Sequence, residues 1–179
     1  VYVPEQKIEA FVQAARDVVQ KRYVSKDTDS YTSIIDDKSF ERLVNALEQA
    51  KAQGATLIPL FGGEAWNAST RKIAPHLLLN APADCELMTR EIFGPILPVI
   101  GYRDLETVVS EINSRPRPLA FYPFTHQSDK VDYLLAHVMS GGVSVNDILL
   151  HVAQTDMPFG GVGGSGMGHY HGVEGFNTF

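Results

Sequence analysis

Short apolar runs alternate with amphipathic stretches along most of this chain, and this alternation constrains the fold most strongly. ATLIPL, KIAPHLLLN, ILPVIGY, LAFYPF and VSVN have the length and composition of buried strands. Between and before them, apolar residues recur at helical spacing. Neighbouring parallel strands need a crossover, usually a helix, and such sheets are covered on both faces. The sequence therefore predicts an α/β fold with an open, mainly parallel sheet and helices on both faces.

The helical spacing predicts four helices. The first begins near Pro4, the second is capped by Asp36 or Asp37, the third follows Asp104, and the last is capped by Ser128. The first is expected to end near Arg22, and the second at Gly54. Gly141 and Gly142 are expected to close the last helix before a strand over residues 143–146. FGGEAWNAST reads as a connecting loop, and the chain from Asp147 onward reads as glycine-rich loop.

Residues 1–179 contain no internal repeat or linker, so we expect one domain. In open α/β sheets, ligands bind beyond the carboxyl ends of the strands. TREIFGP, before ILPVIGY, and the segment after VSVN are therefore the places where a site is expected.

Charge, hydropathy and cysteine content indicate which partners and which cellular compartment the sequence favours. A net charge of -6 argues against nucleic-acid binding, and no apolar run is long enough to span a bilayer. A single cysteine, Cys85, allows no internal disulfide and favours the cytoplasm. Cys85 lies between Asp84 and Glu86, which disfavour a thiolate, so a structural thiol is the preferred interpretation.

The run PFGGVGGSGMGHYHG contains a nominal G-x-G-x-x-G pattern at Gly161, Gly163 and Gly166. A dinucleotide fingerprint requires a strand directly before it. Here the polar segment HVAQTDM precedes it, so we expect a tightly packed backbone instead. His169 and His171, with Asp156 or His151, could bind a metal, but they lack the spacing of a ligand set and no metal site is predicted.

Glu91 and Phe93 stand two residues apart in REIFGP, which puts both side chains on one side of an extended segment. A carboxylate can accept hydrogen bonds from a ribose diol, and an aromatic ring can pack on a flat ring. The alternative is an exposed acid and a core phenylalanine beside a turn. The residues alone favour this alternative.

Four segments taken together resemble the aldehyde dehydrogenase superfamily: REIFGPILPV, RPRPLAFYPF, SGGVSVND and PFGGVGGSGMGHYHGVEGFNTF. They follow in the family's order over almost the whole chain. The closing run is most similar to the class 3-type branch and, within it, to the coniferyl aldehyde dehydrogenases.

The resemblance implies an α/β catalytic domain that serves the NAD- or NADP-dependent oxidation of an aldehyde, such as coniferaldehyde or a related aryl or aliphatic aldehyde. In the family, a cysteine thiolate attacks the aldehyde to form a thiohemiacetal, which passes a hydride to the nicotinamide and becomes a thioester. A glutamate-activated water then hydrolyses the thioester. By motif, Glu91 would bind the nicotinamide ribose and Phe93 would contact the nicotinamide. Asn146 and Phe159 would line the substrate pocket. Relatives form homodimers or tetramers.

One departure from the family pattern bears on activity. The G-Q-x-C motif of the nucleophile does not occur here. We expect the nucleophile, the general-base glutamate and the cofactor-binding domain upstream of Val1, and no catalytic residue within residues 1–179. The isolated chain is then expected to be inactive. Arg90 also stands where many relatives have an acid. The alternative is a noncatalytic nucleotide- or protein-binding module of the same fold.

Overall fold

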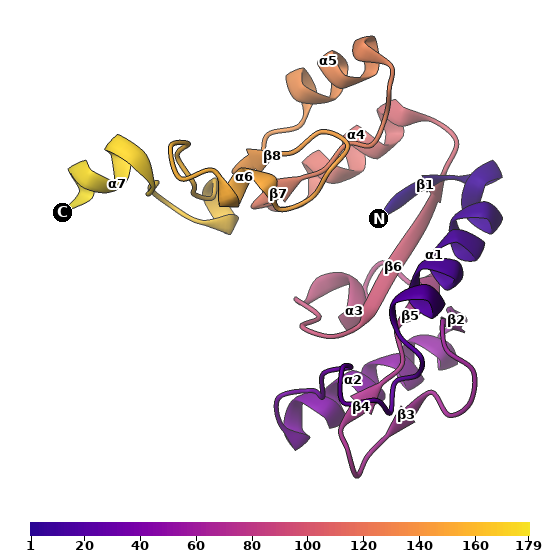
Figure 1. Ribbon diagram of the computed structural model, residues 1–179. Coiled ribbons are helices and arrows are strands. Elements are labelled where there is room, and N and C mark those ends of the chain that lie inside the picture. The colour runs from indigo at the N-terminus through magenta and orange to yellow at the C-terminus, as the bar shows by residue number, and fades with distance from the viewer. The chain divides into compact units, whose positions relative to one another are not determined.

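A four-stranded sheet of order β1-β6-β5-β2 organises the first part of the chain in the computed structural model (Figure 1). The strands are β1 (Tyr2–Pro4), β2 (Thr56–Pro59), β5 (His76–Leu79) and β6 (Ile96–Tyr102). β6 runs parallel to both β1 and β5, and β2 is antiparallel to β5. The predicted mixed α/β fold with a mainly parallel sheet is therefore confirmed.

The structure describes residues 1–179, which form two compact units, Val1–Arg103 and Asp104–Phe179. The expectation of one domain over the whole chain stays a prediction. None of the helices combines the length and apolar character needed to cross a bilayer.

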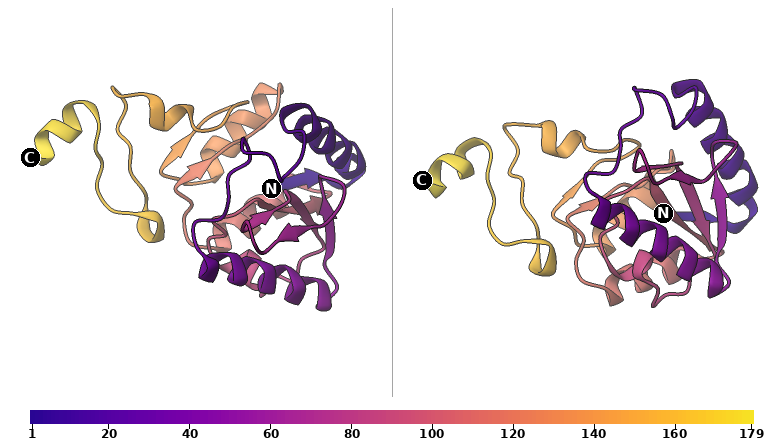
Figure 2. Two further views of the ribbon diagram at one scale, coloured as in Figure 1. Left: turned by 60° about the horizontal axis from the view of Figure 1, so that its bottom comes forward. Right: turned by 90° about the horizontal axis from the view of Figure 1, so that it is seen from below.

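The first unit has a hydrophobic cluster on each face of its sheet. Successive residues of a strand point to opposite faces, so Leu77 and Leu78 enter different clusters. Leu77 packs in the cluster covered by α1 (Ile8–Arg22), which follows a 3₁₀ turn, η1 (Glu5–Lys7). Leu78 packs in the cluster that contains Leu43 and Leu47 of α2 (Asp37–Ala52). Figure 2 shows these two helices on opposite sides of the sheet.

The start and end of α2 follow from local chemistry. Asp36 rather than Asp37 is the N-cap, and its Oδ1 accepts a hydrogen bond from the Ser39 N–H at 2.7 Å. The hydrogen bonds from Ser39 hold the pKa of Asp36 below its usual value. The helix ends at Ala52, and Gly54 follows with a φ of +99°, as the sequence predicts.

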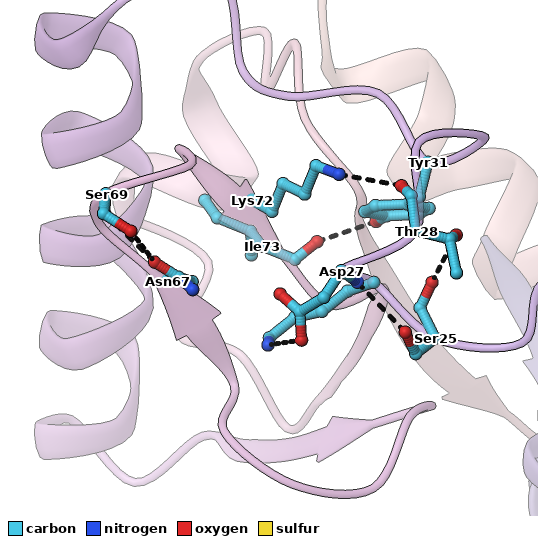
Figure 3. A network of polar contacts seen from close by, with 9 residues as sticks. Ser25, Asp27, Thr28, Tyr31, Asn67, Ser69, Lys72 and Ile73 are labelled. Carbon is cyan, nitrogen blue, oxygen red and sulfur yellow. Dashed lines mark hydrogen bonds and ion pairs between the residues drawn. The ribbon is translucent and has the colours of Figure 1, made fainter.

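A polar network joins the loop after α1 to a small hairpin, β3 (Trp66–Asn67) and β4 (Lys72–Ile73) (Figure 3). The Lys72 ammonium donates to the Thr28 carbonyl at 2.7 Å, and the Tyr31 hydroxyl donates to the Ile73 carbonyl at 2.7 Å. Burial, together with the nearby Tyr23, raises the pKa of Tyr31 to about 12. The segment 61–70, expected to be a loop, thus contains the strand β3. Its pairing partner β4 lies outside that segment, so the segment's own residues did not indicate a strand.

The second unit contains α4 (Leu105–Ser114), β7 (Ala120–Phe121), α5 (Ser128–His137) and β8 (Gly142–Val143). β7 and β8 pair in parallel, and Val109 of α4 packs with Leu134 and Val138 at the end of α5. α4 begins directly after Asp104, as predicted, and Asp104 caps it by accepting from the Thr107 N–H at 2.8 Å.

Several expectations for the second unit are wrong in detail. Ser128 is the first residue of α5 and Gln127 precedes it as the cap, while the helix already ends at His137, before Gly141. The strand expected over 143–146 is only Gly142–Val143. Backbone hydrogen bonds from Ser144 to Phe121 and from Asn146 to Pro123 continue beyond it, and the φ of +58° at Asn146 ends the extended run. The expected loop after Asp147 contains short helical elements: α6 (Leu150–Ala153), η2 (Gly163–Ser165) and α7 (Gly172–Thr178).

His76 should make the stability of the protein fall in mild acid. It is 2% exposed in β5, and its Nδ1 lies 2.6 Å from the Ala74 carbonyl oxygen. Burial lowers the pKa of His76 from 6.5, and the hydrogen bond to Ala74 opposes this only in part. The unfolded chain therefore takes up the proton more readily, so this contribution to stability is complete above pH 6.5 and is lost as pH falls below it.

Urea unfolding between pH 8 and pH 5 measures this effect, with His76→Gln as the variant that cannot titrate. The unfolding midpoint of the wild type should fall more steeply than that of His76→Gln. Parallel pH profiles would contradict the assignment to His76.

Candidate active site

The segment between α3 (Glu86–Thr89) and β6 carries two of the predicted site residues. It has no regular secondary structure, and α2 holds it through contacts to its backbone. An Arg42 Nη donates to the Ile92 carbonyl at 2.5 Å. Gly94 lies directly against Leu43, so that a Cβ on Gly94 would come within 2.5 Å of Leu43 Cδ1. The backbone is thus fixed on both sides of Phe93.

Phe93 is 79% exposed and has a φ of +48°. A core phenylalanine, which the residues alone favoured, is therefore wrong. A left-handed conformation is strained for a bulky residue, and such strain concentrates at functional sites. The expectation of an extended segment also fails at this residue. An aromatic ring is thus presented to solvent from a strained backbone.

Glu91 is exposed, and no hydrogen bond or ion pair within the chain engages its carboxylate. Its neighbour Arg90 pairs instead with Glu86, at 3.5 Å. Both carboxylate oxygens of Glu91 are therefore free to accept hydrogen bonds from a ligand.

The position of this segment relative to the sheet differs from our expectation. Pro95 accepts a hydrogen bond from the His76 N–H at 2.8 Å, and His76 is aligned with Ile96 in the parallel pairing. Residues 90–95 therefore lie at the amino ends of β5 and β6, not beyond the carboxyl ends of these parallel strands. The cause is the crossover from β5, which must return the chain to the amino edge before β6 begins.

Asn146 belongs to the second unit and follows β8. Its Oδ1 accepts from the Thr125 N–H at 2.8 Å, and its Nδ2 donates to the Thr125 carbonyl at 3.0 Å. Asparagine tolerates the left-handed conformation better than most residues. The Asn146 amide thus fixes the loop after β7. Because Nδ2 uses only one of its two hydrogens for this, the other is available to a ligand.

Phe159 forms an isolated antiparallel bridge with Tyr170, through backbone hydrogen bonds of 2.8 and 2.9 Å. Its ring contacts the rings of Tyr170, His171 and His151, with centroids 5.4 to 5.9 Å apart. His151 is 8% exposed and also meets Tyr122 at 5.6 Å. Phe159 is therefore half-buried in an aromatic cluster.

The glycine-rich run closes on itself between Phe159 and Tyr170. A Cβ on Gly161 would collide with the Ser165 carbonyl, and Gly166 needs its φ of +151°. Ser165 Oγ accepts from the Val162 N–H at 2.9 Å. The glycines thus serve close backbone packing, which is the role the sequence predicts.

The histidines of this run make local contacts. His169 pairs with Glu174 at 3.3 Å, and His171 stacks on Phe159. In the structure, which describes every residue of the chain, no three His, Cys, Asp or Glu side chains gather in a way that could hold a metal.

Cys85 is 6% exposed and packs in the core cluster with Leu87 and Ile96. It directly precedes α3, a short helix that the sequence pattern did not predict. The burial fits the structural thiol that the sequence indicates.

Sequence reasoning missed Arg42, Tyr122 and the ring of His151. Arg42 lies 50 residues from Ile92 in the chain, and the aromatic cluster is assembled from four separate segments. No local pattern could have connected them. Glu91 and Phe93 belong to the first unit, and Asn146 and Phe159 to the second.

Residues 1–179 match the Aldehyde dehydrogenase family. Similar proteins include the Probable coniferyl aldehyde dehydrogenase of Pseudomonas aeruginosa, 48% identical over 100% of this chain and 37% of its own length. The Coniferyl aldehyde dehydrogenase of Pseudomonas sp. strain HR199 is 41% identical, over 100% of this chain and 38% of its own length. The mouse Aldehyde dehydrogenase, dimeric NADP-preferring, is 38% identical over 87% of this chain and 32% of its own length. The chain thus spans well under half the length of these relatives.

Two solved structures have a similar fold. The substrate-bound AldH of Staphylococcus aureus gives a TM-score of 0.89 at 34% identity, over 99% of this chain and 38% of that one. The NAD+ complex of the aldehyde dehydrogenase from Bacillus cereus gives 0.83 at 26% identity, over 100% of this chain and 36% of that one.

Replacing Phe93 with asparagine should not weaken the fold. The ring is exposed and buries little apolar surface, whereas a left-handed backbone costs a non-glycine residue about 1–2 kcal/mol, less for asparagine. We expect Phe93→Asn to leave the free energy of unfolding unchanged or to raise it by up to about 1 kcal/mol.

Urea unfolding measures this change. Phe124→Asn is the matched control, because Phe124 is 66% exposed without a positive φ and should gain nothing. A loss above about 1 kcal/mol in Phe93→Asn would mean that the ring packs on the protein.

Proposed function

Because this chain belongs to the aldehyde dehydrogenase family, we propose that it forms part of an enzyme that oxidises an aldehyde to the carboxylic acid with NAD or NADP. Residues 1–179 supply most of the catalytic domain in this proposal. The observation that carries it is Phe93, an exposed aromatic ring held in a strained backbone two residues from the free carboxylate of Glu91.

These residues fit a nicotinamide cofactor, which would accept the hydride from the substrate. The Phe93 ring offers a flat face to the nicotinamide. The two oxygens of Glu91 can accept hydrogen bonds from both hydroxyls of its ribose. One of the similar structures is an NAD+ complex, and the mouse relative is NADP-preferring, so both cofactors stay within the proposal.

We propose Asn146 and Phe159 as residues of the aldehyde pocket. Asn146 can offer its remaining Nδ2 hydrogen while its other amide bonds hold it to Thr125. Phe159 brings an aromatic surface supported by His151 and Tyr170. Such a surface suits an arylpropenal such as coniferaldehyde, and the proposal also includes related aryl or aliphatic aldehydes. The names of the Pseudomonas relatives support the arylpropenal.

The nucleophile and the general-base glutamate are proposed to lie outside residues 1–179. A reactive cysteine needs access to the aldehyde and a setting that stabilises its thiolate. Cys85, the one cysteine in this sequence, is buried among apolar side chains. Its role is therefore structural, and residues 1–179 alone should not oxidise aldehydes.

The complete enzyme is proposed to be a homodimer or tetramer in the cytoplasm. The dimeric mouse relative supports the oligomer. The single, buried and unpaired cysteine supports a reducing compartment.

Glu91→Gln tests the cofactor site in the complete protein. The amide keeps the shape but accepts weaker hydrogen bonds from the ribose, so NAD(P) binding should weaken about tenfold. Fluorescence titration of the cofactor measures the dissociation constant. Glu48→Gln, an exposed acid on α2, is the control and should bind as the wild type does. Equal dissociation constants for Glu91→Gln and wild type would exclude the ribose-binding role.

Cys85→Ala tests the assignment of the nucleophile. The complete protein should retain aldehyde oxidation within about twofold, with a stability loss of about 1 kcal/mol from the smaller side chain. Turnover is measured as NAD(P)H formation, and unfolding is followed in parallel. A folded variant without turnover would make Cys85 the nucleophile. Absence of turnover in the wild type would favour the noncatalytic binding module.

A further inference from the structure

The segment 90–95 raises a physical question, because it has no secondary structure and yet holds Phe93 at a φ of +48°. A strained conformation persists only where the surroundings over-determine it. The contacts that impose it should therefore lie on the backbone next to Phe93. Two of them come from adjacent residues of α2.

Arg42 makes the polar contact. Its side chain is 20% exposed, and one guanidinium nitrogen pairs with Glu86 Oε1 at 3.0 Å. The other nitrogen donates to the Ile92 carbonyl at 2.5 Å. A single side chain of α2 thus joins the first residue of α3 to the peptide that leads into Phe93.

Leu43 makes the apolar contact. It is fully buried, and its Cδ1 occupies the space that a side chain on Gly94 would fill. Because Leu43 is enclosed by the core, it cannot move aside at low cost. The backbone of residue 94 is thereby pressed on α2, while the carbonyl of residue 92 is bound to Arg42. Of residues 92–94, Phe93 is the one that is exposed.

We propose that Arg42 is a positioning residue for the cofactor site: it fixes the Ile92 peptide so that Glu91 and Phe93 are presented to the nicotinamide ribose and ring. The assignment rests on the proposed function. Arg42 itself bonds only to protein groups, so it acts through the segment rather than on the cofactor.

The chemistry of the guanidinium explains why an arginine stands here. Its planar fork offers donors to two acceptors at once, which the single ammonium of lysine matches poorly. Without Arg42, the Ile92 carbonyl loses its charged partner, and Glu86 keeps only the exposed Arg90 at 3.5 Å. Of the two contacts from α2, only that of Leu43 with Gly94 then remains.

The test compares Arg42→Met, Arg42→Lys and wild type in the complete protein. Arg42→Met keeps the length of the side chain and removes both contacts. Arg42→Lys keeps a charge for Glu86 and should lose the Ile92 contact. Arg71→Met is the matched control, because Arg71 also binds a backbone carbonyl, of Ile34, and a carboxylate, of Asp37, but not segment 90–95.

The first measurement is hydrogen exchange of peptides covering residues 90–96 without cofactor. The Ile96 N–H, bonded to the Gly94 carbonyl at 2.8 Å, reports the order of the segment. Exchange there should accelerate about tenfold in Arg42→Met and Arg42→Lys, as the loss of one charge-assisted hydrogen bond predicts, and stay unchanged in Arg71→Met. Unchanged exchange in both Arg42 variants overturns the proposal.

The second measurement is the dissociation constant of NAD(P). It should rise about tenfold in both Arg42 variants and stay at the wild-type value in Arg71→Met. If Arg42→Met does not fold, the exchange and affinity of Arg42→Lys test the proposal. Full recovery of exchange and affinity in Arg42→Lys would assign the effect to the ion pair with Glu86 and overturn the proposal.

The two readouts separate this inference from the function on which it rests. If exchange accelerates in the Arg42 variants but the dissociation constant of NAD(P) is unchanged both in them and in Glu91→Gln, the proposed cofactor site itself is contradicted. If exchange accelerates in the Arg42 variants and cofactor affinity is lost in Glu91→Gln but kept in the Arg42 variants, only the positioning role of Arg42 is contradicted.

Discussion

The parallel pairing of β5 with β6 is the constraint on which the rest of the first unit depends. Leu77 and Leu78 of β5 are buried on opposite faces, so this pair of strands needs both α1 and α2. Parallel neighbours also require the chain to return to the amino edge of the sheet. Residues 80–95 make that return, and they carry α3, Glu91 and Phe93. The candidate cofactor site is therefore part of the connection that the sheet topology imposes.

Two of the predicted site residues, Phe93 and Asn146, have a positive φ. The structure supports these conformations by different means. Asn146 tolerates a left-handed backbone and secures it with two hydrogen bonds to Thr125. Phe93 has no polar group for this purpose, so Arg42 and Leu43 hold the peptides on either side. Exposed and strained at once, Phe93 contributes little to stability, and its conformation fits the proposed role in cofactor binding.

The glycine-rich run illustrates how a motif can mislead. Gly161, Gly163 and Gly166 match a dinucleotide pattern, but Gly161 and Gly166 instead allow the backbone to fold back between Phe159 and Tyr170. The result is an aromatic cluster in which His151 is enclosed by Tyr122 and Phe159. The run thus shapes the surroundings of the proposed aldehyde pocket, while the proposed cofactor contacts lie in the other unit.

The sequence by itself determined the α/β class, the helix α1, the start of α2 at Asp36 or Asp37, the start of α4 after Asp104, and the strand β6. These features depend on apolar periodicity and on hydrogen bonds within a few residues. Through its motifs it also indicated the family and the four site residues, whose roles stay predictions. Only the tertiary structure decided that Phe93 is exposed, that its segment lies at the amino edge of the sheet, and that Arg42 and Leu43 hold it. The physical reason is distance along the chain: these contacts join residues about 50 positions apart, and no local pattern encodes them.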